Sequence, residues 1–327
     1  MPFLAHFSLK EHPFSLTPNS ELFFPAEDHQ KALTSLVYAV WRGEGVVKVV
    51  GEVGTGKTLL CRVLINQLED RAAVAYLLNP QDDPDWLVRA VCREFGVEPA
   101  NGQDPFHELD RFLLKQHREG RRAVLLVDEA QALGVRGLET IRRLSNLETD
   151  KSKLLQIILF GQPELDRLLQ SHELRQLNQR VVFSFALRPF SPAATMQYVR
   201  HRALSVARDL GSGAELFDRR ALKAIARASR GVPRLINIIA DKSMLAAYSL
   251  GARRIGARHV RAALKDSKET LGLRRWAFAG WRRAAMLAVP MVVLAAGGWV
   301  LAGEALPGGW SADSFFSHVL ASVGNAR

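Results

Sequence analysis

Eight consecutive residues have the types and spacing to bind a phosphate group. Three glycines let successive backbone N–H groups curve around a phosphate, and a helix that starts behind them adds partial positive charge. Lys57 then reaches the β- and γ-phosphates of a nucleotide, and Thr58 offers its hydroxyl to Mg²⁺. A nucleotide and Mg²⁺ are therefore the expected ligands. The residues fit G-x-x-x-x-G-K-[ST] and run Gly51, Glu52, Val53, Gly54, Thr55, Gly56, Lys57 and Thr58.

The elements around this loop decide between a phosphate site and a glycine-rich turn that matches by chance. The apolar run 46–50 reads as a buried parallel strand, and 59–65 continues as a helix. Strand, glycine loop and helix form the context that the motif requires. The flanking sequence therefore favours a phosphate-binding loop.

Acidic residues end another apolar strand, 71 residues after Lys57 (128 − 57). Asp128 is expected to hold Mg²⁺, directly or through water. Glu129 beside it can orient the attacking water and accept its proton. Gln162 follows a further strand, where it can bond the γ-phosphate or the water; the alternative is a plain turn residue.

Apolar periodicity divides the chain into regions. Strands are expected at 46–50, 74–78, 123–129, 154–160 and 181–187, and helices at 27–41, 59–65, 85–95, 106–118, 138–147, 165–170 and 173–178. This alternation predicts an α/β fold with a parallel sheet and helices on both faces. From 192 to about 270 only helices are expected. We therefore predict an irregular N-terminal arm at 1–26, an α/β domain at 27–190 and a helical domain at 191–270.

Residues 284–303 form a run of 20 positions without a charge, long enough to cross a bilayer as a helix. Arginines at 274, 275, 282 and 283 precede the run, so the positive-inside rule places the large N-terminal part in the cytoplasm. We expect a basic linker at 271–283, a transmembrane helix at 284–303 and a short tail at 304–327. A buried core helix is the alternative for 284–303.

The bulk composition restricts the remaining possibilities. The 327 residues carry a net charge of +11, which permits contact with nucleic acid or an anionic membrane. The two cysteines lie outside any CxxC motif, as expected for reduced, buried thiols in a cytosolic region. The N-terminus shows no secretory signal peptide.

The combined motifs resemble an AAA+ ATPase, a P-loop NTPase whose α/β domain is followed by a helical lid. This resemblance makes ATP, with Mg²⁺, the expected cofactor. The chain is similar, over about residues 5–270, to the ExeA/MshM family of membrane-associated ATPases. The matching segments are HPFSLTPNSELFF (12–24), GEVGTGKTLLCR (51–62), LLVDEAQAL (125–133), FGQPEL (160–165), LRQLNQRV (174–181) and GVPRLINIIAD (231–241).

The resemblance also implies roles for residues outside the phosphate loop. It makes Asp128 a Mg²⁺ residue and Glu129 the catalytic base, and it places Gln162 at the sensor-1 position. Arg234 falls at the sensor-2 position on the lid. Arg180 is the candidate arginine finger that acts on a neighbouring subunit, with Arg175 as runner-up and Arg188 less favoured; for each arginine a surface salt bridge is the alternative.

A finger supplied in trans implies a homo-oligomeric ring such as a hexamer. The resemblance further implies type II secretion, MSHA-type pili or polysaccharide export as the system served, with inner-membrane or periplasmic assembly proteins as partners. The chain would be a single-pass protein of the bacterial inner membrane. Its tail lacks the peptidoglycan-binding domain of ExeA-type proteins, so direct peptidoglycan binding is not expected.

Two other classes of function remain open. One is an ATP-dependent DNA-binding helper of the transposition-adaptor type, which the net charge of +11 would suit. The run at 284–303 argues against it, because a DNA adaptor does not need a membrane span. The other is a switch or scaffold that binds ATP and barely hydrolyses it, against which Glu129 argues.

Overall fold

The computed structural model describes residues 2–43, 45–68, 71–99, 103–150, 152–208, 213 and 215–270. Residues 1–263 form one compact unit, and a second unit begins at Leu264. The linker, transmembrane helix and tail expected at 271–283, 284–303 and 304–327 lie outside the described residues. Within the described ranges, no helix combines the length and the apolar composition that a bilayer crossing needs.

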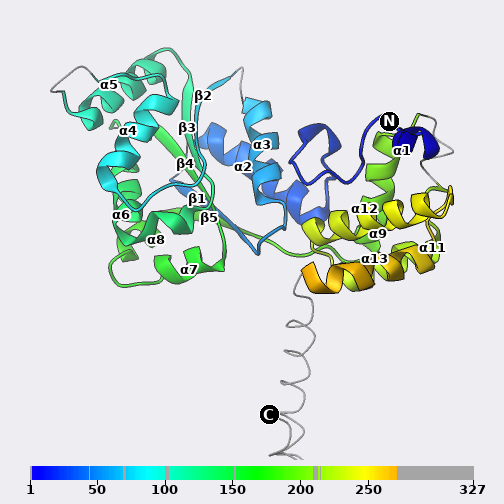
Figure 1. Ribbon diagram of the computed structural model, residues 1–327. Coiled ribbons are helices and arrows are strands. Elements are labelled where there is room, and N and C mark those ends of the chain that lie inside the picture. Colours follow the sequence, from blue (N-terminus) through cyan, green and yellow to red (C-terminus); the bar gives the residue numbers. More distant parts are fainter. Residues whose placement is uncertain are drawn as a thin grey trace, which may run out of the picture. The chain divides into compact units, whose positions relative to one another are not determined.

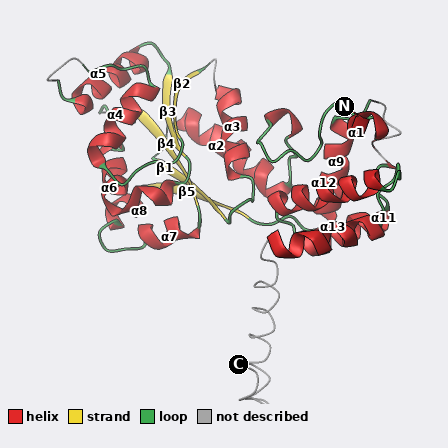
Figure 2. Ribbon diagram, in the orientation of Figure 1, coloured by secondary structure: helices red, strands yellow, loops and turns green. Residues whose placement is uncertain are grey.

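A five-stranded parallel sheet forms the centre of the α/β region (Figures 1 and 2). The expectation of a parallel α/β sheet is confirmed. In order across the sheet the strands are β2 (Ala72–Leu77), β3 (Arg122–Val127), β4 (Leu155–Gly161), β1 (Val46–Gly51) and β5 (Val181–Leu187). Because every pairing is parallel, the loops after β1, β3 and β4 leave the sheet at the same edge, which is called the carboxyl edge below.

Helices cover both faces of the sheet, as Figure 1 shows. Alternate strand residues face opposite sides, so Leu125 and Ile157 enter one core whereas Leu126 and Ile158 enter the other. One face carries α2 (Glu27–Arg42) and α3 (Lys57–Leu68). The other carries α4 (Pro84–Glu94), α5 (Pro105–Arg118), α6 (Gly134–Leu144), α7 (Pro163–Leu169) and α8 (Arg175–Gln179).

The helical region contains α9 (Pro192–Ser205), α11 (Arg219–Ser229), α12 (Pro233–Ser249) and α13 (Ala257–Thr270). The N-terminal arm joins it: Leu9 forms a bridge with Ala207, and Arg202 Nε donates to Pro13 O at 2.5 Å. The arm is not wholly irregular as expected, because it contains helix α1 (Pro2–His6) and the 3₁₀ turn η1 (Ser20–Leu22).

Helix α6 shows the largest departure from the expected helix bounds. The sequence predicted 138–147, but the helix begins at Gly134 and ends at Leu144. Two glycines in the first turn interrupt the apolar periodicity from which the start of a helix is predicted. Gly134 has φ +59°, a conformation that favours glycine, and a Cβ added at Gly137 would lie 3.0 Å from the Leu133 side chain. The helix therefore follows directly from the 3₁₀ turn η2 (Ala130–Leu133).

Candidate nucleotide site

The phosphate loop connects β1 to α3 at the carboxyl edge. Gly54 and Gly56 have φ angles of +80° and +97°, where an L side chain is strained. Thr55 closes the turn by donating its hydroxyl to Glu52 O at 2.8 Å. A Cβ at Gly51 would lie 2.7 Å from that hydroxyl oxygen. The glycines are thus required by the shape of the loop, as the motif predicted.

Lys57 starts α3 and is only 4% exposed. Its ammonium donates to two main-chain carbonyls of the loop, Gly51 O at 2.8 Å and Glu52 O at 3.2 Å. Burial lowers the pKa of this ammonium, and the nearby Glu129 and Asp128 carboxylates oppose that shift. Neutral carbonyls bind a cation less strongly than a phosphate oxygen does, so a nucleotide entering the loop would replace them.

Asp128 is fully buried just after β3. Its Oδ2 accepts hydrogen bonds from Thr58 Oγ1 at 2.7 Å and from the Tyr76 hydroxyl at 3.4 Å. Its Oδ1 accepts from the Glu129 backbone N–H at 2.9 Å. A hydroxyl and a carboxylate in contact are oxygen donors of the kind Mg²⁺ prefers. The residues present therefore fit Mg²⁺, and Thr58 and Asp128 are the ones that would hold it.

Glu129 adopts a left-handed backbone conformation with φ +53°, uncommon for a residue with a side chain. Two amides hold its carboxylate: Gln162 Nε2 donates to Oε2 at 2.8 Å, and Gln131 Nε2 donates to the same oxygen. Burial favours a raised pKa for Glu129, but these hydrogen bonds and the charge of Lys57 outweigh it and leave the pKa below its ordinary value. The carboxylate is therefore ionised and fixed.

Gln162 lies where the sequence placed it. It directly follows β4, which lies between β1 and β3. Because β4 pairs with β3, the Gln162 side chain reaches Glu129 just after the end of β3. The backbone N–H of Gln162 also donates to Gln131 Oε1 at 3.1 Å. The Gln131 amide thus bridges Glu129 and Gln162. The side-chain amide of Gln162 thus contacts the candidate base, and its role in catalysis stays a prediction.

Arg234 lies in the first turn of α12, next to the phosphate loop. Pro233 begins this helix, and the backbone N–H of Arg234 donates to Gly54 O at 3.2 Å. A Cβ added at Gly54 would lie 2.7 Å from Arg234 Cβ. The helical region therefore contacts the loop through this residue, while the Arg234 side chain remains exposed.

The three finger candidates lie elsewhere. Arg180 directly precedes β5, and its carbonyl accepts a hydrogen bond from Val46 N at 3.0 Å. Because Val46 begins β1 and the phosphate loop follows the end of β1, Arg180 lies where the strands begin, at the edge opposite the carboxyl edge. Its guanidinium donates to Ser145 O at 3.2 Å. Arg175 is exposed at the start of α8. Arg188 forms a two-point ion pair with Asp28 in the same chain, at 2.9 and 3.0 Å.

Sequence reasoning missed three residues of this site: Gln131, Tyr76 and His29. Gln131 follows Glu129 by two positions, and that proximity was the available signal. Tyr76 reaches Asp128 only because β2 pairs with β3. Buried His29 contacts Thr55 O through Nε2 at 2.8 Å, and burial lowers its pKa. Nothing in the sequence around His29 indicates a contact 26 residues away.

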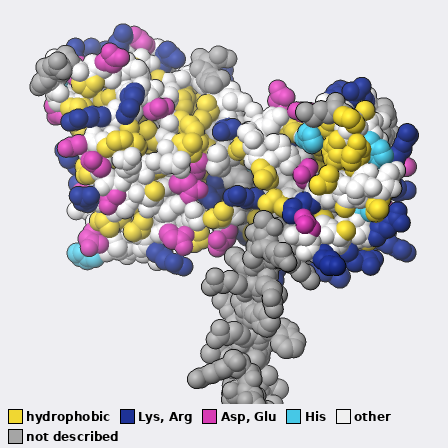
Figure 3. Space-filling model, viewed as in Figure 1, with side chains coloured by type: hydrophobic (Ala, Val, Ile, Leu, Met, Phe, Trp, Pro, Cys, Tyr) yellow, Lys and Arg dark blue, Asp and Glu magenta, His cyan; other side chains and the backbone are white. Residues whose placement is uncertain are grey.

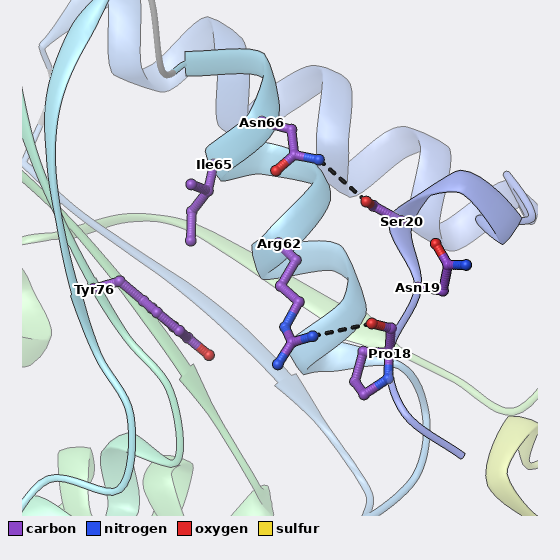
Figure 4. Close-up of a pocket in the computed structure, with 7 residues that line it drawn as sticks. All are labelled: Pro18, Asn19, Ser20, Arg62, Ile65, Asn66 and Tyr76. Carbon is purple, nitrogen blue, oxygen red and sulfur yellow. Dashed lines mark hydrogen bonds between the residues drawn. The ribbon is translucent and has the colours of Figure 1, made fainter. Parts of the chain in front are cut away.

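A surface pocket of about 360 Å³ lies beside the Asp128 network (Figure 4). Arg62 Nη1 donates to Pro18 O at 3.0 Å, and Asn66 Nδ2 donates to Ser20 Oγ at 3.1 Å. Figure 4 shows Tyr76 across the pocket from these contacts, and its hydroxyl is the one that bonds Asp128. The N-terminal arm is thus fastened to the helix that begins with Lys57.

Comparison with known proteins agrees with this geometry. Residues 41–169 match the model of an AAA domain. Over 313 residues, 95% of this chain, the sequence is 39% identical to general secretion pathway protein A of Aeromonas hydrophila. The resemblance to ExeA-type AAA ATPases is confirmed. These matches support the expected ATPase activity. The chain spans about half the length of that relative, 54%.

Solved structures share the fold at low sequence identity. The ORC2 protein of Aeropyrum pernix aligns with a TM-score of 0.62 and 16% identity, covering 79% of this chain and 72% of its own. Cdc6p of Pyrobaculum aerophilum aligns with a TM-score of 0.59 and 19% identity, covering 78% and 70%. At these identities the likeness shows the fold alone.

Proposed function

We propose that this chain is a membrane-anchored AAA+ ATPase that drives or regulates assembly of a bacterial envelope complex for secretion, pilus formation or polysaccharide export. The network that joins Thr58, Asp128, Glu129 and Gln162 beside Lys57 carries the ATPase part of the proposal. The 39% identity to general secretion pathway protein A supports the secretion setting.

The side chains divide the work of hydrolysis. Lys57 holds the β- and γ-phosphates, and the loop N–H groups surround them. Glu129 accepts a proton from the attacking water; amides occupy its Oε2, so Oε1 is the oxygen for this task. Gln162 orients the water or the γ-phosphate. Thr58 and Asp128 would hold Mg²⁺, which would neutralise charge that develops on the phosphate oxygens.

Conformational change would couple this chemistry to assembly. Arg234 on α12 already contacts the phosphate loop, and as sensor 2 it would bind the γ-phosphate of its own subunit. ATP binding would then close the lid, from about residue 192, against the α/β domain, and hydrolysis would reopen it. Assembly or remodelling of an envelope complex would use this cycle.

Arg180 supports an oligomeric form of the enzyme. Its position opposite its own phosphate loop suits action on the nucleotide of a neighbouring subunit. A homo-oligomeric ring such as a hexamer would bring these two edges together. The run at 284–303 would anchor each subunit in the inner membrane, next to partners in the bilayer or periplasm.

The first test combines ATP turnover in vesicles with export or assembly in the cell. The full chain, reconstituted in vesicles, should hydrolyse ATP at a rate per subunit that rises with protein density. The Glu129→Gln variant should bind ATP without turning it over. In the bacterium that encodes the chain, the same substitution should abolish export or assembly by the neighbouring envelope system. Wild-type turnover in the variant would exclude the mechanism, and intact export would exclude the assembly role.

A DNA-binding helper ATPase is the second candidate, and the net charge of +11 is the observation that favours it. Such a protein would bind duplex DNA with an affinity that falls steeply as salt rises. Titration of a labelled duplex at two salt concentrations decides the matter, because the envelope function predicts no tight complex at physiological salt.

A further inference from the structure

Helix α11 carries a cationic stripe along its exposed side. At 100° per residue the five basic positions fall within an arc of about 100°. The opposite side of the helix is buried through residues such as Leu222 and Ile225. The stripe consists of Arg219, Arg220, Lys223, Arg227 and Arg230, all of them exposed.

A second basic segment begins beside this stripe. Phe217 forms a parallel bridge with Ile255, and Asp218 N donates to Ile255 O at 3.0 Å, so the starts of α11 and α13 lie together. We call the α11 stripe and this segment together the basic lid face, and Figure 3 shows Lys and Arg gathered over this region. The segment contributes Arg253, Arg254, Arg258 and Arg261, which are also exposed.

Within the described residues, the side chains of the basic lid face have no carboxylate in ion-pair contact, and Asp218, at the junction of its two segments, is the acid next to them in sequence. Neither 219–230 nor 253–261 contains an acidic residue. In the described part of the chain, none of the nine side chains forms an ion pair, whereas Lys48, Arg142 and Arg188 elsewhere each contact a carboxylate. Like charges at this density repel one another, so the face is complementary to an extended anionic surface.

We propose that the basic lid face docks on the anionic phospholipid headgroups of the membrane. The proposal rests on the membrane anchoring proposed above and names the surface that the lid contacts there. Basic side chains on a helix near a bilayer are attracted by anionic lipids, and the attraction falls off within a Debye length.

The position of the face along the chain favours lipid over nucleic acid. Helix α13, which carries Arg258 and Arg261, ends at Thr270, and the uncharged run at 284–303 starts 14 residues later (284 − 270). Four more arginines lie between these points. The face also lacks Phe, Tyr and Trp, the side chains on which nucleic-acid bases stack.

A fluorescent reporter on α11 tests the docking in the full-length chain. Ala224→Cys accepts a thiol-reactive dye beside the stripe, because the native Cys61 and Cys92 are buried. Vesicles contain nitroxide-headgroup lipid as quencher and are either purely zwitterionic or one-third phosphatidylglycerol. We expect several-fold stronger quenching with phosphatidylglycerol, lost at 0.5 M salt. A dye at Arg93→Cys on α4 provides the background.

Charge-reversal variants of the reporter protein provide the matched comparison. The α11 triple variant, with Arg220→Glu, Lys223→Glu and Arg227→Glu, should lose the phosphatidylglycerol-dependent quenching. A control with the same change in net charge, with Arg89→Glu, Arg93→Glu and Arg118→Glu on α4 and α5, should keep it. Equal quenching in both vesicle types, or equal behaviour of the two triple variants, overturns the proposal.

Two further outcomes distinguish lipid docking from membrane anchoring and from nucleic-acid binding. Flotation of the protein with zwitterionic vesicles reports anchoring alone, so a chain that fails to float refutes anchoring, while quenching by phosphatidylglycerol vesicles still decides docking. A dye response to duplex DNA at 0.15 M salt, without a response to phosphatidylglycerol, would assign the face to nucleic acid and refute lipid docking.

Discussion

The carboxyl edge of the parallel sheet and the opposite edge, where the strands begin, differ in how many of their candidate catalytic side chains have charged or hydrogen-bonding partners within the chain. At the carboxyl edge, Lys57, Asp128 and Glu129 each have hydrogen-bond partners within the chain. At the opposite edge, Arg180 contacts only the carbonyl and hydroxyl of Ser145 through its guanidinium, among the bonds of the described residues. The first edge holds a connected set of candidate catalytic side chains. At the second edge the Arg180 guanidinium forms no ion pair within the described residues, although its charge, after the hydrogen bond from Lys153, contributes to lowering the pKa of the nearby Glu148 carboxyl.

The difference indicates how catalysis would depend on association. Groups that bind phosphate, Mg²⁺ and water act within one subunit, so their removal should lower turnover at any protein concentration. A cation at the far edge acts only if a second subunit brings a nucleotide to it.

Removal of the central groups of the carboxyl edge should have the largest effect. Lys57→Ala and Glu129→Gln should each lower ATP turnover by about 1,000-fold, since both act on the transition state. Glu129→Gln should keep ATP affinity, whereas Lys57→Ala should weaken it. Phosphate release and equilibrium binding of a fluorescent ATP analogue measure these quantities, and turnover near wild type in either variant would contradict the assignment.

Arg180→Ala should lower turnover by about 100-fold if it is the finger. The loss should appear at concentrations where the wild type is oligomeric and vanish where both proteins are monomeric. Arg175→Ala, five residues earlier (180 − 175), tests the runner-up and should change turnover little; a loss of about 100-fold there instead would transfer the role of the finger to Arg175. Turnover that is flat with concentration and unaffected by Arg180→Ala would make Arg180 a structural residue.

Gln131→Leu should lower turnover by about tenfold, because the bridge between Glu129 and Gln162 would be lost. ATP affinity should stay within about threefold of wild type, since Gln131 does not touch the phosphate loop. Ala132→Ser, an exposed neighbour, controls for effects on the turn. If ATP affinity and melting temperature both fall in Gln131→Leu, the substitution has caused a folding defect instead.

His29 should make stability depend on pH. Burial depresses its pKa in the folded state, so the unfolded chain binds the extra proton first and stability is lost as pH falls below about 6.5. Between pH 7.5 and 5.5, His29→Gln should flatten the decline in melting temperature by about 2–4 °C. Parallel declines in both proteins would exclude His29 as the cause.

Arg188→Ala should have the smallest effect, less than about twofold on turnover, because the arginine is exposed and pairs with Asp28 of its own chain. The pair holds the pKa of Asp28 below its ordinary value. A 100-fold loss in this variant would transfer the role of the finger from Arg180 to Arg188. Assays at several protein concentrations make that distinction.

The sequence predicted the parts of the site that depend on local geometry. The conformations of Gly54 and Gly56, the presence of a helix after the loop and the acid after β3 all follow from short patterns. The helix was expected at 59–65 and runs from Lys57 to Leu68. The cap of α4 is equally local: Asp83 accepts hydrogen bonds from the backbone N–H groups of Asp85 and Trp86.

Contacts that depend on strand order could not be read from one sequence. Tyr76 reaches Asp128 because Leu77 lies opposite Val127 in the β2–β3 pairing. Gln131 meets Gln162 because β3 and β4 are neighbours. A strand pattern identifies which residues alternate but leaves open which strands pair. The roles given to Arg234 and Arg180 stay predictions, because the first concerns a bound nucleotide and the second a neighbouring subunit.

The hydrogen bond from the Arg234 N–H to Gly54 O bears on which amino-acid replacements at position 234 would preserve the contact between the lid and the phosphate loop. In the first turn of a helix such an N–H has no partner within the helix, so it is free to bind the loop. Main chain supplies both atoms, and every residue except proline at position 234 preserves the donor. The connection between lid and loop can therefore persist when the side chain at position 234 is replaced. A sequence pattern at that position would not reveal it.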